Sequence, residues 1–330
     1  MKKYLALLLA LVMVFALCAC GSKNETPAPA DGSGEAAAPE AGGELTFVTG
    51  GEAGTYYAFG TVLAQHVSDK TDTKVTAVVG NGSQANVEDL ANGDAQLAFC
   101  QSDVAAYAYN GTNLFEESGA VKDFSVVAAL YMEQVQIVTL DENIKSVADL
   151  KGKNVSIGAA GSGVYFNALD ILGAYGLSES DISPVYQSFA DSADSLKDGK
   201  IDAAFIVAGA PTTAITDLAT GGKQVYLVSL DDEHIDKLMA SSPFYSKAVI
   251  TADTYGLPED VNTVAVGALV LARNDVADAD VYNFVSSIFD NLEEVTAAHA
   301  KGAELSVEFA SSVEGLPYHP GAVQYFSAQG

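Results

Sequence analysis

The sequence predicts an α/β fold of two lobes around a central ligand cleft. From Leu45 onward, short β-branched or apolar runs alternate with amphipathic stretches of helix length, as in α/β proteins with mostly parallel strands. About 290 residues follow the N-terminal segments, which is too many for one small core. Glycine-rich loops also open helices in two separate parts of the chain.

Residues 1–19 have the pattern of a lipoprotein signal peptide. A short basic start precedes the apolar run from Tyr4 to Leu17, which is too short to span a membrane comfortably. Ala19 precedes Cys20 as in a bacterial lipobox, so Cys20 is expected to carry the lipid. An ordinary secretory signal is the alternative, and both place the protein outside the cytoplasm.

Residues 20–43 are expected to form a flexible tether behind the lipidated Cys20. The segment from Ser22 to Gly43 is rich in Ala, Pro, Gly, Ser and Glu, without an apolar period. The chain would therefore meet the membrane through its lipid anchor only.

Two extended runs, Ser125–Leu130 and Gln134–Leu140, follow each other almost end to end and indicate that the chain crosses between lobes. A return crossing is expected in Thr263–Leu271. Two such crossings form a hinged cleft. The predicted boundaries are 44–132 for the first part of lobe 1, 133–261 for lobe 2, and 262–330 for the return crossing and the rest of lobe 1. The other strand signals are Leu45–Val48, Val75–Val79, Gln96–Phe99, Asn154–Ile157, Ser183–Tyr186, Ala203–Val207 and Gln224–Leu227.

The loop from Thr49 to Tyr57 joins the first strand to a helix that continues through Phe59 and has the layout of an anion cradle. Its glycines let the backbone approach a ligand, and Thr55 is a candidate cap for a helix whose first N–H groups lack internal partners. The alternative is a tight turn without a ligand.

A similar loop, Gly158–Gly163, opens a helix through Phe166 in the second half of the chain. Ligands of open α/β sheets bind at the carboxyl ends of strands, so the two loops are expected to face one cleft.

Further polar residues follow two other predicted strands. Gly80–Ala85 has the form G-x-G-x-x-A, but a dinucleotide site is rejected because the segment follows the second strand and its helix is short. Ser83 and Asn86 are instead candidate donors to the cleft. Gln101 and Ser102 are preferred as ligand contacts to Asp103, for which helix capping is the simpler role.

The net charge of −27 and the single arginine, Arg273, argue against nucleic acid and against a basic membrane-binding patch. An anion would have to be held by local dipoles. Cys100 is the one cysteine left after Cys18 and Cys20, so no intrachain disulfide is expected and Cys100 is predicted to be buried.

Catalysis and metal binding find little support. No G-x-S-x-G surrounds Ser83, Ser102 or Ser162, and the four histidines stand singly, without H-E-x-x-H. No cofactor, no metal and no enzymatic activity are therefore expected. An extracellular hydrolase stays a weaker alternative, and a purely structural surface protein another.

The residues together resemble the TAXI family, the extracytoplasmic solute receptors of tripartite ATP-independent periplasmic (TRAP) transporters. The motifs are Gly50-Gly51 through Tyr56-Tyr57; Gly82-Ser83 with Asn86; Gly93–Ala98 into Gln101-Ser102-Asp103; Asp149–Lys153; Gly161-Ser162-Gly163; Gly199–Phe205; Gly209-Ala210-Pro211; and Pro317–Ala322 with Tyr325.

The resemblance implies a type II periplasmic-binding-protein fold that delivers a small carboxylate, glutamate-like or another dicarboxylate, to a TRAP membrane permease. The implied ligand contacts are Gly54, Thr55, Tyr56, Ser83, Asn86, Gln101, Ser102, Ser162, Gly163 and Gly209. Tyr131 and Tyr165 are added because they adjoin the crossing and the second loop. The implied location is the outer face of the bacterial cytoplasmic membrane.

The sequence departs from the family at Glu52 and Ala53, where Thr and Gly are common. A carboxylate beside an anion site is unfavourable unless it points to solvent or meets an amine, so the ligand stays open. A receptor for an ATP-driven ABC importer is the main alternative. His319 is predicted to be structural, docking the last helix, whose start Pro320 would define.

Overall fold

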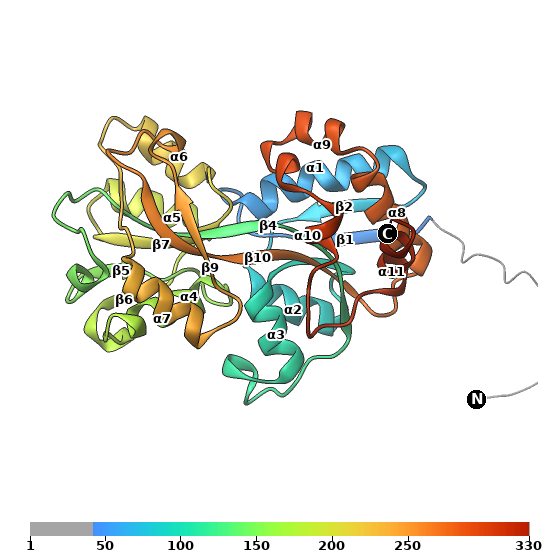
Figure 1. Cartoon of the computed structure of the whole chain (residues 1–330), viewed down its shortest axis with the longest axis horizontal. Coiled ribbons are helices and arrows are strands. Elements are labelled where there is room, and N and C mark those ends of the chain that lie inside the picture. Colours follow the sequence, from blue (N-terminus) through green and yellow to red (C-terminus); the bar gives the residue numbers. More distant parts are fainter. Residues whose placement is uncertain (1–41, 330) are drawn as a thin grey trace, which may run out of the picture. The chain divides into compact units, whose positions relative to one another are not determined.

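A computed structural model describes residues 42–329, which form an α/β fold (Figure 1). The predicted signal peptide (1–19), Cys20 and nearly all of the tether (20–43) lie outside the described residues. No helix within 42–329 is long and apolar enough to cross a membrane.

The strands of these residues join in one sheet in the order β2-β1-β3-β10-β4-β7-β5-β6, with β8 beside β4 and β9 beside β10. They are β1 (Glu44–Val48), β2 (Lys74–Val78), β3 (Leu97–Gln101), β4 (Phe124–Thr139), β5 (Asn154–Ser156), β6 (Ser183–Val185), β7 (Ala203–Ala208), β8 (Tyr226–Leu227), β9 (Ser246–Ile250) and β10 (Val261–Arg273).

Helices cover this sheet in both halves of the fold. They are α1 (Thr55–Lys70), α2 (Ser83–Asn92), α3 (Ser102–Asn110), α4 (Val164–Ala174), α5 (Phe189–Lys197), α6 (Thr213–Thr220), α7 (Asp232–Ser241), α8 (Asp278–Phe289), α9 (Leu292–Ala298), α10 (Val307–Ala310) and α11 (Pro320–Ser327), with short 3-10 turns between them.

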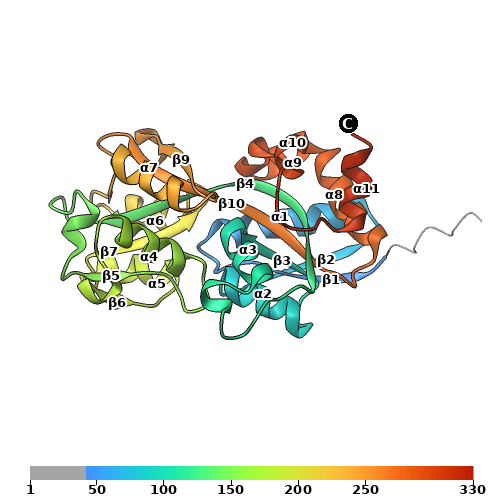
Figure 2. The same cartoon turned by 60° about the horizontal axis from the view of Figure 1, so that its bottom comes forward.

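The elements gather in two lobes. The first lobe holds β1–β3 with α1–α3 and α8–α11, and the second holds β5–β9 with α4–α7, while β4 and β10 run through both (Figures 1 and 2). β10 pairs with β9 at Val261–Ala265 and with β3 at Ala268–Ala272, so it changes partners between the lobes. The predicted two-lobed α/β fold with two crossings is thus confirmed, whereas the numerical lobe boundaries stay a prediction.

Two sequence expectations about the sheet are wrong, and one strand was not predicted. The runs Ser125–Leu130 and Gln134–Leu140 are parts of one strand, β4, because Tyr131, Met132 and Glu133 continue the pairing with β10. β9 had not been expected, since exposed and half-buried residues alternate in it without a long apolar run. The sheet is also mixed, because β4 and β10 run antiparallel to every strand they pair with.

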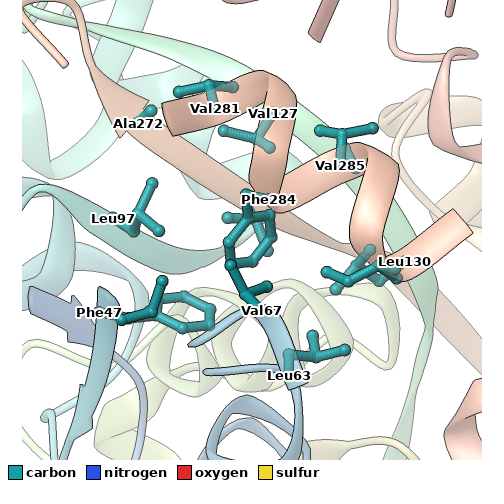
Figure 3. Packing of buried hydrophobic residues seen from close by; sticks show 14 of the residues in the cluster. Phe47, Leu63, Val67, Leu97, Val127, Leu130, Ala272, Val281, Phe284 and Val285 are labelled. Carbon is teal, nitrogen blue, oxygen red and sulfur yellow. The ribbon is translucent and has the colours of Figure 1, made fainter. Parts of the chain in front are cut away.

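The core of the first lobe holds α1 on the sheet. Phe59, Leu63 and Val67 recur at i, i+4 and i+8, which places them on one face of the helix, and all three are fully buried. The rings of Phe47 of β1 and Phe284 of α8 pack in a T-shaped arrangement, with their centroids 5.9 Å apart (Figure 3). This packing holds α1 with its N-terminus at the end of β1.

The second lobe positions α4 in the same way. Ile171 and Leu172 of α4 are buried in one cluster with Val155 of β5 and Phe205 of β7. The glycine-rich loop before α4 is consequently held at the carboxyl end of β5.

Two predictions about single residues are confirmed. Cys100 is a free, fully buried thiol. His319 is the N-cap of α11, where its Nδ1 accepts a hydrogen bond from the Gly321 N–H, and Pro320 takes the first helical position.

Candidate binding site

A cavity of about 330 Å³ lies where the two lobes meet, and it is called the central cavity below. Its walls are the loop after β1, the loop after β2 and the first residues of α1, α2, α4 and α5. Two of these helices belong to each lobe. The volume lies at the small end of the range for ligand pockets, roughly 300–1,000 Å³, and suits a small metabolite.

α1 begins at the central cavity in a way that differs from the expectation for Thr55. The N-cap is Gly54, whose N–H donates to the Gly51 carbonyl at 2.9 Å. Thr55 does not cap the helix, because its hydroxyl donates to the Gly209 carbonyl of the second lobe at 2.8 Å. The first N–H groups of α1 therefore remain for a ligand or water.

α2 starts after Gly82, whose φ of 103° is strained for residues other than glycine. Ser83 lines the central cavity, and its hydroxyl oxygen accepts a hydrogen bond from the Gln101 N–H at 3.0 Å. Asn86, predicted as a ligand contact, lies behind the loop. Its amide donates to the carbonyls of Thr49 and Phe99, which ties the two neighbouring strand ends together.

The second lobe contributes α4 and α5. Ser162 is buried and lines the central cavity, and its hydroxyl has no hydrogen-bond partner within 42–329. Gly163 lies directly against the side chain of Gln101, since a β-carbon there would come 1.5 Å from Gln101 Oε1. Ser188 caps α5 by accepting from the Asp191 N–H.

The electrostatics of the central cavity follow from these helix starts. Its lining contains no lysine, arginine or histidine from the described part of the chain, and its ionisable side chains are Glu52, Glu133 and Tyr56. Positive potential comes instead from the N-terminal dipoles of four helices, each eight residues or longer. The site can accept an anion without a protein cation.

Glu133 is the buried ionisable residue of the cavity that the sequence reasoning missed. It lies in the middle of β4, is 2% exposed and lines the central cavity. Its Oε2 accepts a hydrogen bond from the Tyr56 hydroxyl at 2.7 Å. Burial raises the pKa of Glu133 well above its usual range, against the opposing effects of the Tyr56 hydrogen bond and the Lys301 charge. An acid between the two extended runs of β4 was the sequence signal for it.

Gln101 is held by a buried network that joins the lobes. Its Nε2 donates to Asn167 Oδ1 at 2.9 Å, and Asn167 Nδ2 donates to Asp103 Oδ2 and to the Tyr245 hydroxyl, both at 2.9 Å. Tyr245 in turn donates to Asp170. Burial raises the pKa of Asp103 to about 6, opposed by hydrogen bonds from Val104 and Asn167.

Backbone contacts also hold the lobes together around the central cavity. The Ala85 N–H donates to the Gly161 carbonyl at 3.0 Å, and the Ala214 N–H donates to the Ala53 carbonyl at 3.2 Å. Together with the interlobe hydrogen bonds of Thr55 and Asn167, these contacts show that the cleft is closed in this structure.

Of the predicted contacts, seven line the central cavity: Gly54, Thr55, Tyr56, Ser83, Gln101, Ser162 and Gly163. Besides Asn86, four do not. The Ser102 hydroxyl accepts from the Gly267 N–H, and Tyr165 bonds Glu179. Tyr131 packs edge-on to Phe59 and is not part of the cavity lining. Gly209 contributes its carbonyl to the Thr55 bond.

Several lining residues lay outside the prediction because their positions depend on the meeting of the two lobes. They are Val79, Asn81, Gly82, Glu133, Ala159, Val164, Ser188, Phe189, Ala190, Val207 and Ala208. Glu52, which the sequence analysis expected to point to solvent or to meet an amine, also lines the cavity and is exposed. No group of three or more His, Cys, Asp or Glu side chains within 42–329 is arranged to hold a metal.

Residues 47–330 match the model of the NMT1-like family, and the chain belongs to this family. Among solved structures, it resembles the periplasmic aliphatic sulphonate binding protein SsuA from Escherichia coli at 19% identity and a TM-score of 0.46, over 87% of this chain and 83% of that one. The alkanesulfonate-binding protein SsuA from Xanthomonas axonopodis pv. citri, bound to MOPS, matches at 18% and 0.49, over 88% and 84%. A putative L-cystine ABC transporter protein from Listeria monocytogenes matches at 16% and 0.48, over 82% and 98%.

Proposed function

We propose that this protein is an extracytoplasmic solute-binding receptor, which encloses a small carboxylate between its two lobes and delivers it to a membrane importer. The proposal includes lipidation at Cys20 and attachment to the outer face of the bacterial cytoplasmic membrane. It assigns the receptor no catalytic step.

The convergence of four helix N-termini on one cavity that lacks basic side chains carries this proposal. A helix N-terminus stabilises a nearby anion by about 0.3–1 kcal/mol when exposed and up to ~2 kcal/mol when partly buried. Several such termini offset the repulsion from a chain whose net charge is −27. The unpartnered Ser162 hydroxyl adds a donor for a carboxylate oxygen.

The importer is either a TRAP permease, which the sequence motifs imply, or an ABC importer, the transporter type named for the Listeria monocytogenes structure. We take the ABC importer as the first type to test. Co-purification of the receptor with each candidate membrane partner, with and without the solute, distinguishes the two.

A hydrolytic role needs a base next to a nucleophile. Ser162 has a buried hydroxyl without a partner in the cavity lining, but no histidine from residues 42–329 lines the central cavity. Binding without turnover is therefore the function that the geometry supports better.

A thermal-shift screen followed by calorimetry tests the proposal. A bound solute stabilises the folded state by mass action, about 2.7 kcal/mol at a concentration 100 times Kd. We expect small carboxylates to raise the melting temperature, whereas their amides and methyl esters do not. Stabilisation by neutral sugars alone would contradict the proposal.

A further inference from the structure

The lining of the central cavity contains a buried carboxyl group, although the helix N-termini around the cavity favour anions from a ligand. Glu133 projects from β4 between the lobes, and its Oε2 is occupied by the Tyr56 hydroxyl. Its Oε1 has no hydrogen-bond donor from residues 42–329. An anion site without protein cations should exclude such a group unless the ligand supplies a matching donor.

A second acceptor lies near the same cavity with a defined orientation. Asn167 donates its Nδ2 to Asp103, so its Oδ1 faces Gln101 and receives Gln101 Nε2. The Gln101 Oε1 is thereby turned to the other side, where it lies against Gly163 without a donor among the described residues. Gln101 is 2% exposed, and an unpaired buried amide oxygen costs about 1–3 kcal/mol.

The charge of Lys301 lowers the pKa of Glu133, but Lys301 forms no ion pair with Glu133. Lys301 is almost fully buried, but its Nζ bonds Glu304 and lies 5.4 Å from the centre of the Tyr131 ring. Glu133 thus has a hydroxyl partner and no ion-pair partner within the described part of the chain.

We propose that Glu133, together with Gln101 of the same cavity lining, forms a subsite for a protonated amino group, so that the solute is a carboxylate that also carries an ammonium group. The helix N-termini receive the carboxylate, and the Glu133 and Gln101 oxygens accept hydrogen bonds from the ammonium. This assignment rests on the proposed receptor function and narrows its ligands from carboxylates in general to amino acids.

Ligand pairs that differ only in the amine provide the test. Calorimetry would compare glutamate with glutarate, aspartate with succinate, and alanine with propionate, at pH 7.5. We expect the amine-bearing member of the pair that fits the cavity to bind at least tenfold more tightly than its amine-free partner.

Glu133→Gln and Glu88→Gln form a matched pair of variants, because Glu133 is buried and lines the cavity, whereas Glu88 of α2 is exposed and lies outside the cavity lining. Glu133→Gln is expected to remove most of the preference for the amine, whereas Glu88→Gln retains it. Should Glu133→Gln fail to fold by circular dichroism, Tyr56→Phe removes the hydroxyl that holds Oε2 and is expected to reduce the preference at least threefold.

The outcomes separate this inference from the function beneath it. Tight binding of the amine-free acids, equal to that of the amino acids, would overturn the ammonium subsite while leaving a carboxylate receptor. An undiminished amine preference in both Glu133→Gln and Tyr56→Phe would overturn the role of Glu133. If no carboxylate binds at all, the proposed function itself fails.

Discussion

Gly163 shows, at the scale of one residue, how closely the lobes approach at the central cavity. It has ordinary helical angles, so its backbone would accept any residue. The requirement for glycine comes from Gln101, whose Oε1 occupies the space of a β-carbon. The sequence predicted this glycine as a ligand contact, and the structure adds the steric reason for its size.

Gly163→Ala is accordingly expected to weaken ligand binding at least tenfold, because the added methyl displaces Gln101 or separates the lobes. Forcing a group into a packed site costs about 1–3 kcal/mol. Calorimetric Kd values check this.

Gly173→Ala is the matched control, since it lies on the same helix with no atom within 4 Å of the added carbon. It should leave the Kd unchanged and slightly raise stability, as alanine is the better helix former. Equal effects of the two substitutions on Kd would refute the steric explanation.

We assign the pH dependence of ligand affinity to the titration of Glu133. The ionisable groups that act on it are Tyr56 of α1, Asp103 of α3 and Lys301 near α9. Burial raises the pKa of Glu133 in the free receptor, and a bound ammonium would lower that pKa. Ligand binding therefore releases a proton at pH values between the pKa of Glu133 in the complex and its pKa in the free receptor.

Affinity for an amino acid should consequently rise as pH increases toward the free-state pKa of Glu133, by up to about tenfold per pH unit. The affinity of the matching amine-free acid should fall instead, because Glu133 becomes a charge of the same sign. Calorimetry between pH 5 and 8, in buffers of different ionisation enthalpy, measures both trends. The rise should be absent in Glu133→Gln.

At the scale of elements, α4 connects the cavity to the closure of the lobes. Its loop presents Ser162 and Gly163 to the central cavity, and one turn later Asn167 bonds Gln101 and Asp103 of the first lobe. Asn167 is fully buried, so its amide depends on these partners in the closed cleft.

Asn167→Ala is expected to favour the open cleft and to weaken binding roughly 5- to 150-fold. The basis is the loss of two interlobe bonds worth about 0.5–1.5 kcal/mol each. Small-angle scattering with and without ligand would report the change in compaction, and calorimetry the change in Kd.

Tyr245→Phe serves as the control, because its hydroxyl bonds Asn167 and Asp170 within the second lobe only. It should lower thermal stability with a smaller effect on Kd. If Asn167→Ala binds as tightly as the unmodified protein, α4 does not link binding to closure.

At the scale of the whole molecule, buried acids make stability depend on pH. Burial raises the pKa of Asp103 in the folded state to about 6, compared with an ordinary value of 3.8 for aspartate, so the folded state binds the proton more tightly. Its contribution to the unfolding free energy is fully present below pH 3.8 and is lost as pH rises through 6, a change of about 2–3 kcal/mol.

Asp103→Asn removes this titration. Relative to the unmodified protein, the variant should gain about 2–3 kcal/mol of unfolding free energy between pH 4 and pH 7. Urea unfolding at several pH values in that range measures the difference. A difference that does not vary with pH would show that Asp103 does not titrate as the structure implies.

Local sequence determined much of this protein: the α/β alternation, the glycine loops at strand ends and the helices that follow them. These features depend on residues within a turn or two of each other, so the loops around Gly54 and Gly163 could be recognised along the chain. The crossings near Glu133 and in β10 were predicted for the same reason, from extended runs of apolar residues.

Only the tertiary structure decided which side chains meet. Asn86 had the residue type of a ligand contact, yet it holds two strand ends together, and Thr55 bonds the opposite lobe instead of capping its helix. Glu133 enters the cavity because β4 runs unbroken between the lobes, and Asn167 reaches Gln101 from 66 residues away in the chain. Burial and pairing over such separations are set by how the lobes pack, which no local pattern encodes.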